Sequence, residues 1–465
     1  MAPTVDNRVC FKSFWDKYSG KPDNTAMMLN NNADELEESD RMDILSSLPD
    51  VTGLDAVDIG AGIGRFTTIL AKTAKSVLST DFIDEFIKKN KERNCHLPNV
   101  SFAVGDAAHL QLKPKSVDFV FTNWLMMYLN DHETVEFITN IMTWLRADGY
   151  AHLRESCSEP STGRRVDKDA VSLHDTTAHN PTSYRYSSLY INLLRSIRFR
   201  DEMDGSLWRF DLKWSTSVPT YIKRMNNWRQ VHWLVQKVPA SPSDKETSFD
   251  DLLTLFSTTW NNQQKEWDAL LDDEQKSWTD EVLTSAVSRV LNTENPTIFA
   301  YTPRKLSPHL HINSHQFAER FSAHVWNAER ESLYYRTSLT KATTLKDQRV
   351  RFAWHESFTS SVEYWKGQTA EFDFFVATEL LKENDEEIAQ VKNLLTKDSP
   401  VILLEPVQEV DEEAIRKRLE SAGLHSVKVT DVTESLVATI TDFHNQRPEL
   451  PAKLDTKWIL VEARV

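Results

Sequence analysis

The sequence predicts an α/β fold built on a doubly wound parallel sheet, and three features of its first half support this. A short apolar run, Leu54–Val57, leads into the glycine-rich stretch 58–64 (Asp-x-Gly-x-Gly-x-Gly), and the residues that follow it have apolar positions at helical spacing. Strand and helix patterns then alternate up to residue 156. Val117–Asn123 is an almost unbroken β-rich run, which is typical of a central parallel strand.

The glycine-rich stretch lies between a predicted strand and a predicted helix, where an α/β sheet binds a nucleotide-like ligand. Glycines let the backbone turn tightly and approach a ligand without a Cβ in the way. The dinucleotide fingerprint G-x-G-x-x-G would need a glycine where Arg65 stands, so the spacing does not favour a dinucleotide. Asp81 ends the next apolar run and can accept hydrogen bonds from both hydroxyls of a ribose. The alternative is an ordinary turn that holds three glycines by chance.

Composition excludes several classes of function. No window approaches the roughly 18 apolar residues of a membrane span, and the amino terminus is polar, so we expect no membrane insertion. The three cysteines lie far apart, which is typical of a reduced cytoplasmic protein, and the histidines show no metal-ligand spacing. The net charge of −15 argues against nucleic acid as a partner.

Charge and glycine usage predict two unlike domains, 1–240 and 241–465, joined near Pro239–Ser243. Residues 1–240 carry 29 Lys and Arg against 31 Asp and Glu, whereas residues 241–465 carry 25 against 38, and only two of the eleven glycines. In the second half, predicted strands at 372–379, 400–406 and 457–462 resemble the latter part of the first fold without its glycine loop. Two unrelated strand-bearing segments remain the alternative.

The glycine stretch with Asp81 resembles the first motif of class I S-adenosylmethionine-dependent methyltransferases. Three further strings, Asn123–Leu129 (NWLMMYL), Ala26–Leu29 (AMML) and Arg154–Cys157 (RESC), resemble the phosphoethanolamine N-methyltransferases. The resemblance covers about residues 10–240 and is strongest to the first domain of the di-domain plant enzymes. An active first half followed by a degenerate methyltransferase-like domain is similar to the nematode form that performs only the first methylation.

The resemblance implies S-adenosylmethionine as the methyl donor and S-adenosylhomocysteine as its product. In this fold an acidic residue after the third strand, here Asp106, can reach the adenine amino group. The helices before the first strand would form a lid, although simple core helices would have the same pattern. The expected cofactor-binding residues are Tyr18, Asn30, Asp58, Gly60, Gly62, Asp81, Phe82, Asp106, Ala107 and Asn123.

Methyl transfer to an amine needs the neutral amine, and a proton acceptor near it would help. In single-domain members of the family a Tyr–His pair does this, but Tyr128 stands in the place of the histidine, which leaves the base unassigned. Tyr128 or Trp124 could hold a cation against its ring, or could simply cap the sheet. For the phosphate, the family implies Tyr184, Arg185, Tyr186 and Lys237, with Arg154 behind them.

The predicted function is therefore N-methylation of phosphoethanolamine to phosphomonomethylethanolamine, the first step towards phosphocholine, with a partner enzyme for the later methylations. Two alternatives stay open. One is a methyltransferase acting on a quinone- or sterol-like acceptor, and the other is a protein that binds S-adenosylmethionine without catalysis. The sequence leaves open how many methyl groups are added, the oligomeric state and the role of the second half.

Overall fold

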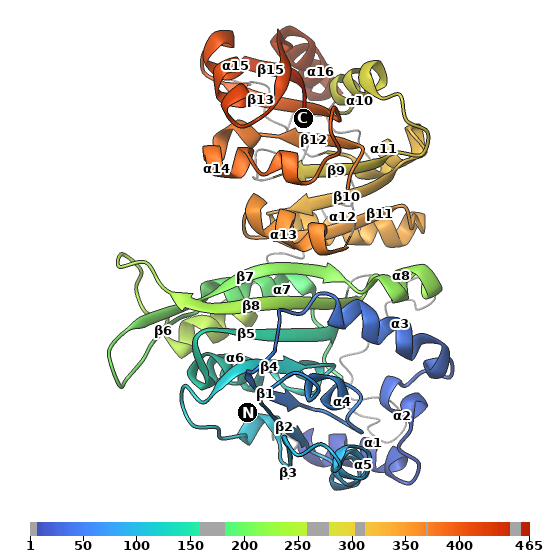
Figure 1. Cartoon of the computed structure of the whole chain (residues 1–465), viewed down its shortest axis with the longest axis vertical. Coiled ribbons are helices and arrows are strands. Elements are labelled where there is room, and N and C mark those ends of the chain that lie inside the picture. Colours follow the sequence, from blue (N-terminus) through green and yellow to red (C-terminus); the bar gives the residue numbers. More distant parts are fainter. Residues whose placement is uncertain (1–6, 159–181, 258–278, 303–311, 369–370, 447–456) are drawn as a thin grey trace. The chain divides into compact units, whose positions relative to one another are not determined.

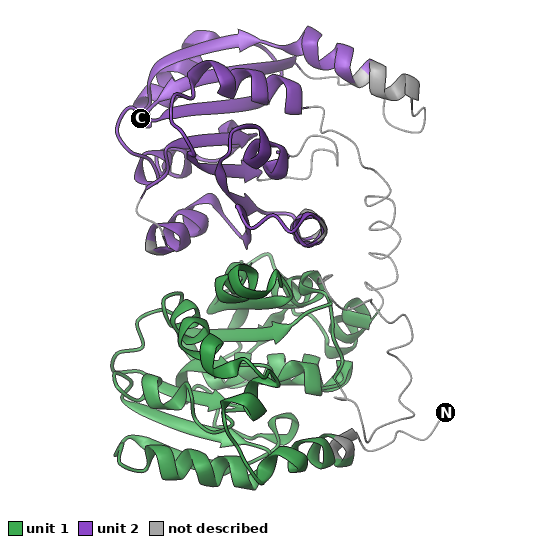
Figure 2. Cartoon of the chain, turned by 90° about the vertical axis from the view of Figure 1, so that its right-hand side faces the viewer, with its two compact units in different colours: residues 1–264 green, residues 265–465 purple. Residues whose placement is uncertain are grey.

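The chain forms two compact units, residues 1–264 and 265–465, in a computed structural model that describes residues 7–158, 182–257, 279–302, 312–368, 371–446 and 457–465 (Figure 2). The first unit extends past the expected boundary at residue 240 because the segment after it packs on that unit. Asp244 accepts a hydrogen bond from Arg198 (2.7 Å), and the ring of Phe256 lies 6.0 Å from that of Tyr190.

The first unit begins with three helices and continues as alternating strands and helices (Figure 1). Residues 249–257 add a further helix. In chain order the elements are α1 (Asn7–Ser19), α2 (Asn24–Met28), α3 (Ala33–Leu45), β1 (Asp55–Ile59), α4 (Thr67–Leu70), β2 (Ser76–Asp81), α5 (Asp84–Asn94), β3 (Val100–Val104), η1 (Ala107–His109), β4 (Val117–Thr122), η2 (Met126–Tyr128), α6 (Asp131–Trp144), β5 (Leu145–Ser156), α7 (Ser187–Ser196), β6 (Arg198–Arg200), β7 (Leu207–Ser217), α8 (Pro219–Met225) and β8 (Gln230–Pro239).

The sheet of the first unit has the strand order β3-β2-β1-β4-β5-β8-β7, with β6 paired to β7. The first five strands are parallel, while β8 runs antiparallel to both β5 and β7. The chain leaves β1 towards β2 and β3, then returns to β4 on the other side. Open α/β sheets bind ligands at this switch point, so the predicted doubly wound fold is confirmed and its ligand-binding edge is defined.

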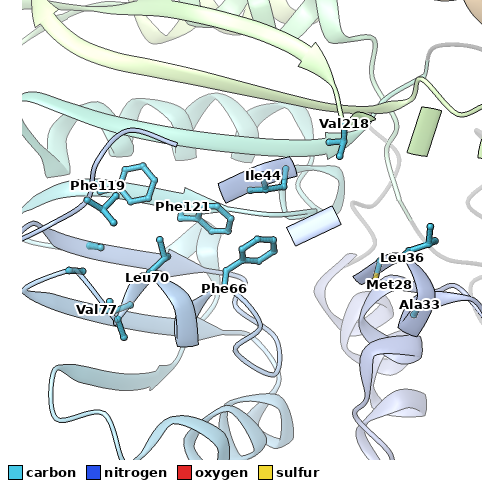
Figure 3. Packing of buried hydrophobic residues seen from close by; sticks show 14 of the residues in the cluster. Met28, Ala33, Leu36, Ile44, Phe66, Leu70, Val77, Phe119, Phe121 and Val218 are labelled. Carbon is cyan, nitrogen blue, oxygen red and sulfur yellow. The ribbon is translucent and has the colours of Figure 1, made fainter. Parts of the chain in front are cut away.

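Aromatic residues of β4 anchor the core on one face of this sheet. Phe119 and Phe121 are two residues apart on β4, so their side chains point to the same face, and both are fully buried (Figure 3). Phe66, at the start of α4, lies 4.8 Å from Phe121 between ring centres. Because α4 follows the glycine-rich turn directly, this packing fixes the turn against the sheet.

The second unit repeats the same topology. Its strand order is β11-β10-β9-β12-β13-β15-β14, with β15 antiparallel to β13 and to β14. The sequence indicated only the latter part of this sheet, but the structure adds three earlier strands. The described elements are α10 (Asp280–Val290), β9 (Thr297–Thr302), α11 (Ser314–Arg320), β10 (His324–Glu329), α12 (Ser332–Leu345), β11 (Val350–His355), α13 (Phe358–Gln368), β12 (Phe374–Thr378), η3 (Leu380–Lys382), α14 (Asp385–Ile388), η4 (Val391–Asn393), β13 (Pro400–Val407), α15 (Glu412–Ser421), β14 (His425–Asp431), α16 (Thr433–Gln446) and β15 (Lys457–Arg464).

Backbone geometry identifies matching positions in the two units. Trp124, after β4, has φ of 59°, and Glu379, after β12, has φ of 57°, a left-handed conformation that is uncommon for both residue types. Each donates its backbone N–H to the neighbouring strand, Trp124 to Arg154 (2.7 Å) and Glu379 to Leu404 (3.1 Å). Glu379 therefore stands where Trp124 stands, and Leu404 stands where Arg154 stands.

Two histidines, His152 of β5 and His232 of β8, are buried in contact with each other, and they make the stability of the first unit depend on pH. Nε2 of His152 lies 3.1 Å from Nδ1 of His232, and the ring of His152 stacks on Phe121. Burial lowers the pKa of His152 to about 3 and holds that of His232 well below its usual value. Both rings are therefore neutral in the folded protein over the whole physiological range.

We expect acid to destabilise the first unit through this pair. Below about pH 6.5 the unfolded chain takes up protons that the folded histidines do not, so each histidine lowers the free energy of unfolding by about 1.4 kcal/mol per pH unit. Averaged over pH 7.5 to 5.5, His232→Leu should remove about half a proton from this slope in urea unfolding, because an unfolded histidine titrates in the middle of that range. Equal slopes in wild type and His232→Leu would refute the assignment.

Candidate active site

A cavity of about 680 Å³ opens at the carboxyl ends of β1, β2 and β4, under the helices α1 and α2. The structure brings thirteen of the predicted site residues into its lining, whereas Arg154, Arg185, Tyr186 and Lys237 are not part of it. The thirteen are Tyr18, Asn30, Asp58, Gly60, Gly62, Asp81, Phe82, Asp106, Ala107, Asn123, Trp124, Tyr128 and Tyr184.

The glycine-rich turn gives the cavity a backbone floor. Gly60 and Gly62 have φ of 74° and 54°, a region that other residues rarely adopt. A Cβ on Gly62 would lie 2.8 Å from the sulfur of Met27, which belongs to α2. Glycine is needed there both for the turn and for the close approach of the helix that covers it.

Two buried carboxylates stand at the ends of β1 and β2. Asp58 accepts a hydrogen bond from the Thr67 hydroxyl (2.6 Å), and burial raises the pKa of Asp58 to about 7. Asp81 accepts from the backbone N–H groups of Gly62 (2.8 Å) and Ile83 (2.9 Å), and burial raises its pKa to about 6. Each Asp81 oxygen uses one acceptor site in these bonds and keeps another for a ligand hydroxyl.

Aromatic side chains of α1 cover the acceptor end of the cavity. The ring of Tyr128 lies 5.7 Å from both Phe11 and Trp15, in edge-to-face contacts, and Trp15 also packs on Phe86 of α5. Figure 1 shows α1 and α2 beside this edge of the sheet. α1 therefore covers the acceptor end of the cavity and makes it largely aromatic.

Trp124 is held in its left-handed conformation by both its backbone and its indole. Besides the backbone bond to Arg154, its Nε1 donates to Oε1 of Gln230 (2.7 Å), and the amide nitrogen of Gln230 donates to Ser156 (2.8 Å). A bulky residue in this region costs about 1–3 kcal/mol, which surrounding contacts must offset. Such strain is concentrated at functional sites, and here it directs the indole into the cavity wall.

The loop that carries Met126–Tyr128 is clamped by two charged side chains. The carboxylate of Glu155 accepts from the backbone N–H groups of Leu125 (3.0 Å), Met126 (2.7 Å) and Met127 (3.1 Å). Burial nevertheless raises the pKa of Glu155 to about 7. In the second unit Glu405 accepts from the backbone of Leu381 in the matching loop (3.1 Å), so the carboxylate clamp belongs to the fold.

Arg185 supplies the other half of the clamp, and its prediction as a phosphate ligand is wrong. Its guanidinium donates to the carbonyls of Met126 (3.1 Å) and Leu129 (2.7 Å) and pairs with Asp131 (2.8 Å). The side chain is buried beneath the loop and is absent from the cavity lining. Tyr186 precedes α7, next to Arg185, and does not line the cavity either.

Arg154 is fully buried and reaches the cavity only through other residues. Its guanidinium carbon lies 3.6 Å from the ring centre of Trp124, and one nitrogen donates to Oδ1 of Asn123 (2.8 Å). Another nitrogen donates to Asp40 of α3 (3.1 Å). Arg154 therefore stands behind the cavity wall and cannot contact the substrate.

Lys237 lies at the opposite end of the sheet from the cavity, so its prediction as a phosphate ligand is also wrong. In the antiparallel pair, Gln230 at the start of β8 faces Ser156 at the end of β5, which leaves Lys237 near the amino ends of the parallel strands. Its ammonium donates to the carbonyls of Met142 and Leu145 (both 2.8 Å) and so caps the end of α6. Burial lowers the pKa of Lys237 to about 8.

The same antiparallel direction brings in the cationic residue that sequence reasoning missed. Arg229, just before β8, lines the cavity, and its guanidinium carbon lies 5.0 Å from the ring of Tyr184. Its Nε donates to the carbonyl of Cys157 (2.7 Å), while its two terminal nitrogens have no hydrogen-bond partner among the described residues. Because β8 runs antiparallel to β5, its first residues lie at the cavity end of the sheet and Lys237 lies at the far end.

Within the described residues, no helix is both long and apolar enough to span a bilayer. No group of three or more His, Cys, Asp and Glu side chains in that part of the chain is arranged to hold a metal ion.

Comparison with known proteins identifies the family. Residues 57–153 match the model of a methyltransferase domain. The chain is 57% identical to phosphoethanolamine N-methyltransferase 1 of Caenorhabditis elegans over 458 residues, which cover 98% of this chain and 95% of that protein. This chain belongs to the phosphoethanolamine N-methyltransferase family.

Two more members of the family differ in how much of the chain they match. A crystal structure of Haemonchus contortus phosphoethanolamine N-methyltransferase 1, in complex with phosphoethanolamine and S-adenosylhomocysteine, is 55% identical, with a TM-score of 0.91, and the match covers 99% of this chain and 98% of that one. Phosphoethanolamine N-methyltransferase 3 of Arabidopsis thaliana is 34% identical over 255 residues, 54% of this chain and 49% of the plant protein. The nematode likeness therefore includes both units.

Proposed function

We propose that this chain transfers a methyl group from S-adenosylmethionine to the amine of phosphoethanolamine, giving phosphomonomethylethanolamine and S-adenosylhomocysteine. The observation that carries the proposal is a single cavity with three parts. The first part is a cofactor cradle with Asp58 and Asp81, and the second is an aromatic wall. The third is Arg229, whose terminal nitrogens can donate hydrogen bonds to a phosphate. Radiolabelled methyl transfer to a panel of phosphobases, quinones and sterols tests it; transfer to a quinone or sterol instead would refute it.

The cradle suits S-adenosylmethionine. The positive φ of Gly60 and Gly62 lets a ligand approach the backbone, and the spare acceptor sites of Asp81 match the two hydroxyls of a ribose. Asp106 also lines the cavity, and it is the residue that would reach the adenine amino group. When bound, the cofactor supplies a methyl group on a cationic sulfonium.

The amine must lose its proton before its lone pair can form the N–C bond as the C–S bond breaks. Deprotonating a lysine-like ammonium near pH 7.5 costs about 4 kcal/mol, and a nearby positive charge lowers that cost. Tyr128 and Trp124 line the acceptor end and would orient the amine in line with the methyl group. The proton is lost to solvent or to a base, and no described residue is assigned as that base.

We propose that Arg229 and Tyr184 bind the phosphate. A guanidinium with free terminal nitrogens can bind phosphate through two parallel hydrogen bonds. Tyr184 lies beside it, and both residues line the cavity. These two residues replace Arg185 and Lys237, whose donors are already used within the fold.

Three further parts of the proposal concern the setting of the reaction. We propose that a separate enzyme adds the later methyl groups, that nucleic acid is not a partner, and that the activity is cytoplasmic. The negative net charge and the free thiols of Cys95 and Cys157 support the second and third of these.

Asp81→Asn should weaken S-adenosylhomocysteine binding without unfolding the protein. Losing a charge-assisted hydrogen bond costs about 1.5–3 kcal/mol, or roughly 10- to 150-fold in Kd, measured by calorimetry at pH 7.5. Because the Asp81 pKa is about 6, wild-type affinity should fall as the pH drops from 7 to 5, with a shallower fall in the variant. Asp84→Asn, an exposed neighbour, is the control; unchanged affinity in Asp81→Asn would contradict the assignment.

Arg229→Gln and Lys237→Met should separate the two ends of β8. Arg229→Gln should raise the KM for phosphoethanolamine by roughly 10- to 100-fold with little change in kcat, because the phosphate is held alike before and during methyl transfer. Lys237→Met should keep that KM and lower the melting temperature, since it removes the α6 cap. Steady-state kinetics and thermal unfolding measure both effects. A raised KM in Lys237→Met, with an unchanged KM in Arg229→Gln, would instead assign the phosphate site to Lys237.

The full chain should bind one S-adenosylhomocysteine, in the first unit. In the second unit, the end of the sheet that matches the cradle has lost its key groups. Glu329 ends β10 as Asp81 ends β2, but burial raises the pKa of Glu329 to about 8, higher than that of Asp81. By strand register, Ala300 and Thr302 stand in the places of Asp58 and Gly60. Calorimetry should give a stoichiometry near one, and a value near two would show a second site.

A further inference from the structure

One buried carboxylate, Asp40 of α3, holds two arginines that lead to different parts of the cavity. Asp40 is fully buried; its Oδ2 accepts from Arg65 (3.0 Å) and its Oδ1 from Arg154 (3.1 Å). We propose that Asp40 is a positioning residue that couples the cofactor subsite to the acceptor subsite. It lines no part of the cavity itself, so it acts only through the two arginines.

The Arg65 branch leads to the cofactor cradle. Arg65 follows the glycine-rich turn directly, lines the cavity and is 5% exposed. Its guanidinium carbon lies 5.4 Å from the ring centre of Phe66, the next cavity-lining residue. Glu37 also pairs with Arg65 (3.3 Å), so this branch has two carboxylates and depends only partly on Asp40.

The Arg154 branch leads to the acceptor wall and depends on Asp40 far more. The buried guanidinium touches three lining residues: it donates to Asn123 (2.8 Å), stacks at 3.6 Å on Trp124 and lies 5.2 Å from the ring of Tyr221. A buried guanidinium needs a carboxylate to offset its desolvation, and Asp40 pairs with it. The orientation of all three wall residues therefore depends on a salt bridge to α3.

The second unit indicates that this branch serves the site and is not required by the fold. At matching positions the second unit keeps the carboxylate clamp, as Glu405, yet has Leu404 in place of Arg154 and Glu379 in place of Trp124. The same backbone arrangement thus forms with a leucine at the position of Arg154. The arginine stack is found in the unit that contains the cavity.

The test is a double-mutant cycle on the full chain. Asp40→Asn should lower kcat with phosphoethanolamine roughly 10- to 100-fold, the effect of misplacing reacting groups by about an ångström, and weaken S-adenosylhomocysteine binding by a smaller factor. Arg154→Met should lower kcat alike and weaken that binding less than Asp40→Asn does, because Arg154 reaches the cofactor side only through Asn123. In Asp40→Asn/Arg154→Met, kcat should stay within about twofold of Arg154→Met, because the second change removes a partner already lost.

Asp43→Asn is the matched control. Asp43 lies on the same helix and accepts from the backbone N–H of Thr220 (2.6 Å), so its loss should lower the melting temperature but keep kcat. If the Asp40 and Arg154 effects multiply, or if Asp40→Asn keeps wild-type kcat, the coupling is refuted. Should Asp40→Asn fail to fold, Arg154→Met decides alone: unchanged kcat, or an equal loss of cofactor affinity, overturns the proposal.

The inference rests on the proposed function only for the choice of acceptor. A wild-type chain that does not methylate phosphoethanolamine would refute the proposed function. The coupling would then be judged by S-adenosylhomocysteine binding, which Asp40→Asn should weaken more than Arg154→Met does.

Discussion

The acceptor wall of the cavity depends on how the backbone after β4 is satisfied. This short loop leaves the sheet without regular strand partners, so its polar groups need other partners or they would be buried at a cost. Glu155 accepts three of its N–H groups and Arg185 donates to two of its carbonyls. The loop therefore has a fixed shape before any ligand binds, which reduces the ordering cost of binding.

Opposite charges are distributed in layers around the cavity. The carboxylates of Asp58 and Asp81 face the cofactor side, where their raised pKa values reflect burial that a ligand with hydroxyl donors would compensate. Arginines stand behind the acceptor side, and Arg229 offers unused donors to the cavity. Breaking a buried pair such as Asp40–Arg154 leaves a charge uncompensated, at a cost of about 3–5 kcal/mol.

The predicted cofactor residues come together in one cavity, whereas most of the predicted phosphate residues do not, for a geometric reason. The cradle consists of residues at the ends of consecutive parallel strands, so spacing along the chain is enough to assemble Asp58 and Asp81. The phosphate side involves an antiparallel strand, in which a residue seven positions along lies at the far end of the sheet. Charge alone could not distinguish Arg185, which is consumed by the loop, from Arg229, which is not.

The chain contains two copies of one architecture, and comparing them separates the features that the fold requires from those that differ between the units. Both units keep the strand order, the left-handed residue after the fourth strand and the glutamate beneath it. These shared features are what the backbone needs in order to fold this way. What differs, at Asp58, Gly60, Trp124 and Arg154, can be assigned to ligand chemistry with the shared framework cancelled out. The second unit thus provides an internal reference against which substitutions in the first unit can be sorted.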